Sequence, residues 1–295
     1  MILVVANPYS GGGPNRRRVD ALVRELGALG AAPRVVWEAA ERSAAFADAA
    51  AMSGCRAVIA AGGDGTIAQV INELPRGLPL AVLPLGNENL LARALGLGRE
   101  PTALARAVVE CRTRALDIGR ATAGDRTRLF ALMVGAGFDA AVVHRMAAWR
   151  ASGPALRRVR RASYVGPIAA SLFGYAHTRV RLTTEAGTVQ GAHCLIANVP
   201  GYALDIRLTP AASPDDGRLD WLMLERPGLM PLAAYCWAAY RGRHLERRDV
   251  RAGQATRLTL TAETPTPVQL DGDPWGTTPV EVDVVPRALT VIATG

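Results

Sequence analysis

The first third of the chain alternates short apolar runs with segments of helical periodicity. We expect strands at residues 2–5, 34–37, 57–61 and 80–84, and helices at 16–29, 43–52, 67–74, 90–95 and 102–111. Strands separated by helices at this spacing pair in parallel through right-handed crossovers. The sequence therefore predicts a doubly wound α/β domain.

The pattern changes after about residue 117, where short strand-like runs follow one another with few helices between them. The runs are residues 115–121, 128–134, 180–184, 189–198, 219–224, 255–262, 268–270 and 280–285, and helices are expected at 140–149 and 231–240. Many short strands predict an antiparallel β-sandwich. We therefore expect an α/β domain over residues 1–117 and an all-β domain over residues 118–286.

All 34 basic residues of the chain are arginines, and the net charge is +8. A P-loop kinase, a protein kinase and a Schiff-base enzyme each need a lysine, so the composition excludes these three classes. The basic excess favours polyanionic partners such as nucleotide phosphates or an anionic membrane surface.

The four cysteines, at positions 55, 111, 194 and 236, have no C-x-x-C spacing, which predicts reduced thiols instead of a disulfide framework or a zinc site. The opening MILVVANP lacks a basic segment before its apolar residues, and no apolar stretch reaches the roughly 20 residues that cross a bilayer. We expect a cytoplasmic protein.

The strongest local signal is the turn Gly62-Gly63-Asp64-Gly65-Thr66, which follows a predicted strand and opens a predicted helix. Glycines let the backbone approach a ligand, and free amides at a helix start attract phosphate. An acidic residue in such a turn suits a magnesium ion that bridges phosphate and protein. A purely structural glycine turn is the alternative.

Two more turns follow predicted parallel strands. The first is Asn7-Pro8-Tyr9-Ser10-Gly11-Gly12-Gly13, and the second is Pro84-Leu85-Gly86-Asn87-Glu88-Asn89-Leu90. Because the carboxyl ends of parallel strands face one crevice, we expect the three turns to lie at one ligand site. A triglycine that serves only as a flexible turn is the alternative for the first.

These three turns, in this order, resemble the diacylglycerol kinase catalytic family, which includes bacterial diacylglycerol kinases and sphingosine kinases. The second half resembles it too, through the segments Leu116–Gly119, Gly135–Asp139, Asn198–Tyr202, Asp215–Asp220 and Leu270–Asp273. The resemblance covers essentially the whole chain.

The resemblance implies an N-terminal α/β nucleotide domain, a C-terminal β-sandwich for the lipid and an active site in the cleft between them. It also implies that a final strand at 288–293 returns to the first domain, so that residues 287–295 join residues 1–117. By the same resemblance, Asp273 is the general base and Asp64 organises metal and phosphates. The residues that it implies for ATP are Asn7, Ser10, Gly11, Gly12, Gly62, Gly63, Asp64, Gly65, Thr66, Ile67, Ala68, Asn87 and Asn89.

The chain departs from the family pattern at several of these positions. Asp273 stands where the family has Glu, which retracts the carboxylate by about one bond length, and misplacement by roughly 1 Å can cost about a hundredfold in rate. Asn87 replaces a Thr, Val36 stands where many relatives have a Thr, and Glu88 and Leu90 alter the usual turn. A plain turn residue is the alternative for Asp273.

The Asp215–Asp220 segment resembles a structural magnesium site of some relatives. Carried over, Asp216 supplies a carboxylate while Ser213 and Arg218 supply main-chain carbonyls, and oxygen-only ligation suits Mg²⁺ or Ca²⁺. A β-turn before the strand at 219–224 is the alternative.

Two arginine clusters lie near apolar residues. Arginines occupy positions 157, 158, 160 and 161 in the first cluster and positions 241, 243, 247, 248 and 251 in the second. They predict transient contact with an anionic membrane at its inner face, with a solvated basic surface as the alternative. No nucleic-acid motif is present, the four histidines have no metal-ligand spacing, and a homodimer is left open.

The sequence thus predicts a magnesium-dependent kinase that moves the γ-phosphoryl group of ATP to the hydroxyl of diacylglycerol or a related lipid such as a sphingoid base. An NAD kinase-like enzyme shares the GGDGT turn and is one alternative. A catalytically weakened lipid- or nucleotide-binding protein, suggested by Asp273, Asn87 and Val36, is the other.

Overall fold

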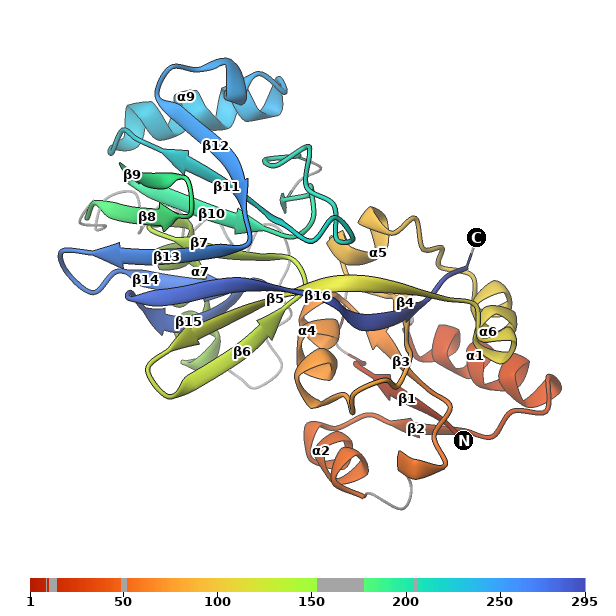
Figure 1. Ribbon diagram of the computed structural model, residues 1–295. Helices are drawn as coiled ribbons and strands as arrows, with labels where there is room; N and C mark the ends of the chain where they lie inside the picture. Colours follow the sequence, from red (N-terminus) through yellow and green to blue (C-terminus); the bar gives the residue numbers. More distant parts are fainter. Residues whose placement is uncertain (9, 11–14, 49–51, 153–177, 204–205, 295) are drawn as a thin grey trace. The chain divides into compact units, whose positions relative to one another are not determined.

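A computed structural model describes the chain except for residues 9, 11–14, 49–51, 153–177, 204–205 and 295 (Figure 1). The contacts divide it into two compact units. The first unit is Met1–Leu116 with Arg287–Gly295, and the second is Asp117–Pro286. The strands β5 (Thr113–Ala123) and β16 (Val280–Ile292) carry the chain from one unit to the other.

The first unit is an α/β sheet whose strands run in the order β2-β1-β3-β4, all parallel. These strands are β1 (Ile2–Ala6), β2 (Pro33–Val36), β3 (Ala57–Gly62) and β4 (Leu80–Pro84). Every residue of β1, β3 and β4 is buried, which is why these strands read as continuous apolar runs. The end of β16 adds a further parallel strand beside β4.

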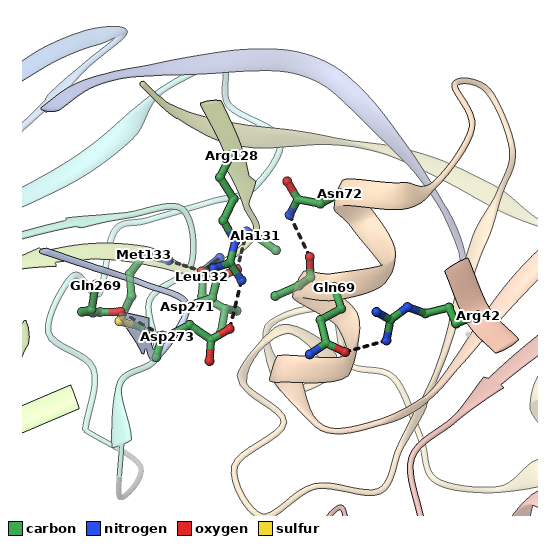
Figure 2. Close-up of polar contacts among 12 residues, drawn as sticks. Arg42, Gln69, Asn72, Arg128, Ala131, Leu132, Met133, Gln269, Asp271 and Asp273 are labelled. Atoms are coloured by element: carbon green, nitrogen blue, oxygen red, sulfur yellow. Dashed lines mark hydrogen bonds and ion pairs between the residues drawn. The ribbon is translucent and has the colours of Figure 1, made fainter. Parts of the chain in front are cut away.

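The helices of this unit are α1 (Asn15–Ala28), α2 (Ala39–Ala47), α4 (Asp64–Glu73), α5 (Leu90–Ala94) and α6 (Pro101–Glu110). Side chains of α1 and α6, including Leu22, Leu26 and Leu104, form one core cluster with the sheet. Helix α2 is tied to α4 by the Arg42–Glu73 ion pair. Arg42 also donates a hydrogen bond to Gln69, as Figure 2 shows. The predicted α/β fold is confirmed.

The second unit is a sandwich of two mainly antiparallel sheets. One has the order β12-β11-β10-β7-β14-β15, and the other contains β16-β13-β8-β9 with β5 and β6 beside it. One cluster of buried side chains draws on both sheets, among them Phe130, Ile196 and Leu260. The predicted sandwich is confirmed. The strands are β6 (Arg126–Phe130), β7 (Met133–Ala136), β8 (Val180–Thr184), β9 (Gly187–Gly191), β10 (His193–Ala197), β11 (Leu219–Leu224), β12 (Val250–Ala255), β13 (Arg257–Ala262), β14 (Pro267–Leu270) and β15 (Asp273–Thr277).

Two predicted strands were wrong as single elements. Residues 128–134 form the end of β6 and the start of β7, which belong to different sheets, because the amides of Ala131 and Leu132 bond to the Asp271 carboxylate. Residues 189–198 likewise divide into β9 and β10. Conversely, the runs at 280–285 and 288–293 are one continuous strand, β16.

The helices of the second unit are α7 (Phe138–Ala151), α9 (Leu229–Tyr240) and the short η3 (His244–Glu246). All four cysteines are free thiols, of which Cys55 and Cys194 are buried while Cys111 and Cys236 are exposed. Within the described residues, no helix is both long enough and apolar enough to span a membrane.

Candidate active site

Three loops of the first unit meet at the carboxyl ends of β1, β3 and β4. The Asn7 amide donates to the Thr66 hydroxyl at 3.3 Å, and the Gly63 N–H donates to the Ser10 hydroxyl at 3.2 Å. These bonds join the first turn to the GGDGT turn. The structure thus brings together the loops that the sequence placed at one ligand site.

Glycine is required where the GGDGT turn meets the turn after β4. A Cβ on Gly86 would lie 2.5 Å from the Gly63 Cα, and a Cβ on Gly63 would lie 3.1 Å from the Gly86 Cα. A Cβ on Gly62 would collide with the Thr66 side chain at 2.2 Å. These three glycines therefore permit close packing of the protein on itself.

The Asp64 side chain fastens the same two turns. Its carboxylate accepts the N–H groups of Leu90 at 3.0 Å and Leu91 at 3.3 Å, the first two residues of α5. Burial raises the pKa of this carboxyl, although the two amide bonds act in the opposite direction. Asp64 thus has a structural partner in the first unit, and its predicted contact with metal and phosphate stays a prediction.

The other residues predicted to bind ATP differ in accessibility. Thr66, Ile67, Ala68 and Asn89 are buried. Gly65 and Asn87 are exposed, and a Cβ on Gly65 would meet nothing within 4 Å. Gly11 and Gly12 lie outside the described residues.

Asp273 stands at the start of β15, directly after the turn that joins it to β14. Asp271 and Gly272 in this turn both have positive φ, 49° and 83°, as a two-residue hairpin turn of the Asp-Gly type requires. The Gly272 N–H donates to the Gln269 side chain at 2.8 Å. The hairpin therefore places the Asp273 carboxylate at the first residue of β15.

The Asp271 carboxylate anchors this hairpin to the crossing between β6 and β7. It accepts three backbone N–H groups, from Ala131 at 2.8 Å and from Leu132 and Met133 at 2.9 Å (Figure 2). The sequence reading assigned a role only to Asp273 of this segment. The Asp-Gly pair between apolar runs is a hairpin signal, but nothing local reveals acceptors so far along the chain.

Arg128 of β6 holds Asp273. Its Nη2 lies 2.9 Å from Asp273 Oδ2, and the Asp273 side chain is 37% exposed (Figure 2). Oδ1 of Asp273 has no hydrogen-bond partner among the described residues. One carboxylate oxygen is thus held by Arg128, while the other is left without a described partner.

A cavity of about 330 Å³ opens beside Asp273 in the second unit. Its lining comes from α7 and the hairpin: Val143, Met146, Ala147, Ala151, Gly272, Asp273 and Pro274. Among the lining residues that the structure describes, Asp273 is the one charged side chain. The arrangement suits a molecule with an apolar body and a polar group directed at the carboxylate.

A second carboxylate, that of the half-buried Asp139, is linked to the hairpin by hydrogen bonds. Asp139 of α7 accepts hydrogen bonds from the Tyr202 hydroxyl and, at 2.9 Å, from the Gln269 amide. Burial raises the pKa of the Asp139 carboxyl. Since Gln269 also accepts from Gly272, this network links α7 to the Asp273 turn. The sequence reading quoted Asp139 but gave it no role.

The predicted metal residues lie in the turn before β11. Oδ1 of Asp216 accepts the Arg218 N–H at 2.9 Å, and the Gln254 amide lies 3.0 Å from Asp220 Oδ2 and 3.5 Å from Asp216 Oδ2. Burial, and then the nearby Asp216 charge, raise the pKa of Asp220. Among the described residues, no group of three His, Cys, Asp or Glu side chains could hold a metal. A set of one carboxylate and two carbonyls nevertheless has the hard oxygen donors that Mg²⁺ prefers.

The comparisons with known proteins cover both units. Residues 1–121 match the model of the diacylglycerol kinase catalytic domain, and residues 132–293 match that of the YegS C-terminal NAD kinase beta sandwich-like domain. A diacylglycerol kinase of Mycobacterium tuberculosis strain H37Rv is 27% identical, over 99% of this chain and 94% of the relative. A Pseudomonas aeruginosa strain PAO1 protein named "Probable lipid kinase YegS-like" is 30% identical, over 98% of this chain and 93% of the relative.

Solved structures show the same fold. A diacylglycerol kinase from Bacillus anthracis aligns with a TM-score of 0.69 at 17% identity, covering 99% of this chain and 96% of that one. An NAD kinase from Archaeoglobus fulgidus, solved with ATP, aligns with a TM-score of 0.58 at 13% identity, covering 99% and 93%. With both domain models matched and a 30% identical relative matched nearly end to end, the chain belongs to the diacylglycerol kinase and YegS-like lipid kinase family, and it is a kinase.

Proposed function

We propose that this kinase transfers the γ-phosphoryl group of ATP to a hydroxyl of a lipid, such as diacylglycerol or a sphingoid base. The observation that carries the proposal is the cavity beside Asp273, whose described lining residues have no charged side chain except that carboxylate. A lipid has the matching chemistry, because its acyl part is apolar and its reacting hydroxyl needs a proton acceptor.

Asp273 acts as the general base. Arg128 fixes one of its oxygens, so the other faces a bound hydroxyl with little freedom. As the hydroxyl oxygen bonds to the γ-phosphorus, its O–H proton passes to Asp273, the bond from phosphorus to the bridging oxygen breaks, and ADP leaves with that oxygen's electrons. General-base contributions of this kind are worth about 10² to 10⁴ in rate.

The loops of the first unit hold the nucleotide. Helix α4 begins at Asp64 with Gly63 as its N-cap and has no side-chain cap. The Thr66 N–H already donates to the Gly63 carbonyl at 2.9 Å, so a phosphate group would bind at the amides that precede it. Gly65 leaves open space beside them. The proposal requires that these loops and Asp273, which belong to separate units, come together around one ATP–lipid pair.

Magnesium belongs to the proposal in two places. Asp216, with the carbonyls of Ser213 and Arg218, would hold a structural ion that fixes the turn before β11. An ion on the phosphates would neutralise charge during transfer.

Thermal unfolding tests the structural ion at Asp216. If this site exists, Mg²⁺ raises the melting temperature of the wild type but not that of Asp216→Asn. Asp125→Asn on the exposed β5–β6 turn serves as the control.

Radiolabelled ATP tests the main proposal when it is offered with diacylglycerol, with sphingosine and with NAD. We expect a labelled lipid, and we expect Asp273→Asn to lower kcat about a hundredfold or more with an unchanged melting temperature. Asp283→Asn breaks the comparable ion pair with Arg120 and should retain activity. No labelled lipid from folded protein would defeat the proposal, and labelled NAD would replace it with NAD kinase activity.

One observation favours a second candidate, a weakly active lipid- or nucleotide-binding protein. Asp273 has the shorter side chain and is held by Arg128, so it reaches less far than a free Glu would. Asp273→Glu separates the two candidates: higher turnover identifies a working enzyme with a retracted base. Tight binding of ATP and lipid with no turnover by either form identifies the binding protein.

A further inference from the structure

Helix α9 is apolar around its whole circumference yet lies on the surface of the second unit. Its sequence, LMPLAAYCWAAY, has no charged residue. Helices of this composition are normally buried in a core or in lipid. In α9 only Tyr235 and Ala239 are buried, and Figure 1 shows the helix at one edge of the unit, beside β12.

The exposed residues of α9 form one stripe. The large ones are Leu229 at 47%, Met230 at 80%, Trp237 at 63% and Tyr240 at 71% exposure. Ala233 and Cys236, also exposed, fall between them, so the set follows the i, i+1, i+4, i+7, i+8, i+11 spacing of one helix face. We call these six residues the α9 stripe.

The opposite side of α9 is fastened to the sandwich. The Tyr235 hydroxyl donates to the Asp249 carbonyl at 3.2 Å and accepts the Arg226 N–H at 3.1 Å. The Arg247 guanidinium lies 5.0 Å from the centre of the Tyr235 ring. These contacts hold the helix in one rotation, so the α9 stripe is a fixed feature of the surface.

Unneutralised positive charge lies in the segment that carries the stripe. Residues 225–251 contain six arginines and three acids. The three acids are each paired: Glu225 with Arg251, Glu246 with Arg243 and Asp249 with Arg247. The remaining arginines, Arg226, Arg241 and Arg248, are exposed and have no ion pair among the described residues.

The side chains of the stripe also suit the boundary between water and lipid. Trp237 and Tyr240 stack with ring centres 5.9 Å apart, and Arg241 lies 5.9 Å from the Trp237 ring. Tryptophan, tyrosine and arginine combine apolar bodies with polar ends, which favours the level of lipid headgroups. Twelve residues of helix are about 18 Å long, too short to cross a bilayer but long enough to lie in its surface.

We propose that the α9 stripe docks this protein on a bilayer containing anionic phospholipid, with the stripe in the acyl boundary and Arg226, Arg241 and Arg248 at the headgroups. This docking surface belongs to the second unit alone and does not depend on the proposed phosphotransfer. It extends the sequence prediction of membrane contact, because the arginines supply charge complementarity and α9 supplies the inserted surface.

The test is sedimentation of the full-length protein with vesicles of phosphatidylcholine, with and without phosphatidylglycerol, in the absence of ATP. We expect binding that needs phosphatidylglycerol and weakens in high salt. Met230→Ser with Trp237→Ser should lower the affinity roughly tenfold or more, and Arg241→Ser with Arg248→Ser about as much. The control is Leu29→Ser with Arg99→Ser, which replaces one exposed apolar residue and one exposed arginine of the first unit by serine.

Trp237→Phe separates insertion from general loss of structure. This variant should keep its affinity for vesicles, while the vesicle-induced blue shift of tryptophan fluorescence should shrink. Vesicle binding that is equal in the stripe variants and the control overturns the proposal. So does a lipid-free dimer that dissociates on Trp237→Ser, because the stripe would then cover a second copy of this chain.

Discussion

Asp139 is a carboxyl group kept inside the second unit by two neutral donors, Tyr202 and Gln269, with no cation among its described partners. Such a group is held where its charged form is unfavourable, and burial therefore raises its pKa above the ordinary value of 3.8. Because Gln269 also holds the Asp273 turn, the protonation of Asp139 bears on the hairpin that carries the proposed base.

We predict that Asp139 makes the protein less stable as the pH rises above 3.8. The folded state keeps this proton longer than the unfolded state does, so its stabilising contribution is complete below the unfolded pKa and is lost as the pH rises through the folded pKa. Urea unfolding of the wild type and Asp139→Asn over a pH series checks this. The free energy of unfolding of the wild type relative to the variant should fall with rising pH, by at most about 1.4 kcal/mol per pH unit; parallel profiles would contradict it.

An added methyl group would meet the protein backbone at Gly86 but open space at Gly65. Substitutions at these two glycines therefore distinguish a packing role from a role in ligand binding. Gly86→Ala places a Cβ 2.5 Å from the Gly63 backbone, and we expect a loss of about 1–3 kcal/mol in unfolding free energy.

The Cβ of Gly65→Ala meets nothing within 4 Å, so the melting temperature should stay unchanged. The KM for ATP should rise if a phosphate group approaches this residue. Unchanged ATP binding in a stable Gly65→Ala would remove this residue from the nucleotide site.

At the scale of the elements, Asp271 is the main anchor of the β14–β15 hairpin. Its carboxylate accepts hydrogen bonds from three backbone amides between β6 and β7. We predict that Asp271→Ala lowers the free energy of unfolding by about 2–4 kcal/mol, because it leaves those amides unpaired and puts alanine at positive φ. Asp271→Asn keeps one acceptor oxygen and tolerates this φ, so it should cost less. Thermal unfolding of both variants measures the difference, and equal losses would show that the amides find other partners.

The elements also show what sequence can predict. Buried strands such as β1, β3 and β4 can be predicted from their own residues, because each is a continuous apolar run. Glycine turns that directly follow a strand can be predicted in the same way. The run at 128–134 was misjudged because its interruption comes from Asp271, about 140 residues further along the chain. The β12 sequence VRAGQA is weakly apolar and was not predicted as a strand.

At the candidate site too, contacts between residues distant in sequence could not be predicted. Local motifs located the three loops of the first unit and the Asp273 turn. They gave no sign of the Arg128–Asp273 pair or of the Asp139 network, whose partners lie 145, 63 and 130 residues apart in sequence. The roles proposed for the site residues in ATP, metal and lipid binding stay predictions.

At the scale of the whole molecule, β16 is a single strand that contributes to two cores. Val280 and Val282 lie in the cluster of the sandwich, whereas Ile292 lies in that of the α/β unit. Near its end, Val291 pairs with Leu80 of β4, and the Ala293 N–H donates to the Arg112 carbonyl at 2.8 Å. The first unit therefore cannot complete its sheet until residues 291–293 have been made.

Substitutions at the two ends of β16 should consequently affect different units. Ile292 is fully buried, and Ile292→Ala should lower the stability of the first unit by about 2–5 kcal/mol. Val282→Ala, also buried, should weaken the sandwich by a smaller amount because fewer atoms are removed. Hydrogen exchange distinguishes them: Ile292→Ala should reduce protection in β1, β3 and β4, and Val282→Ala in β8 and β13. Equal loss throughout the chain in both variants would show instead that the two units unfold together, so that a defect in either one would remove both.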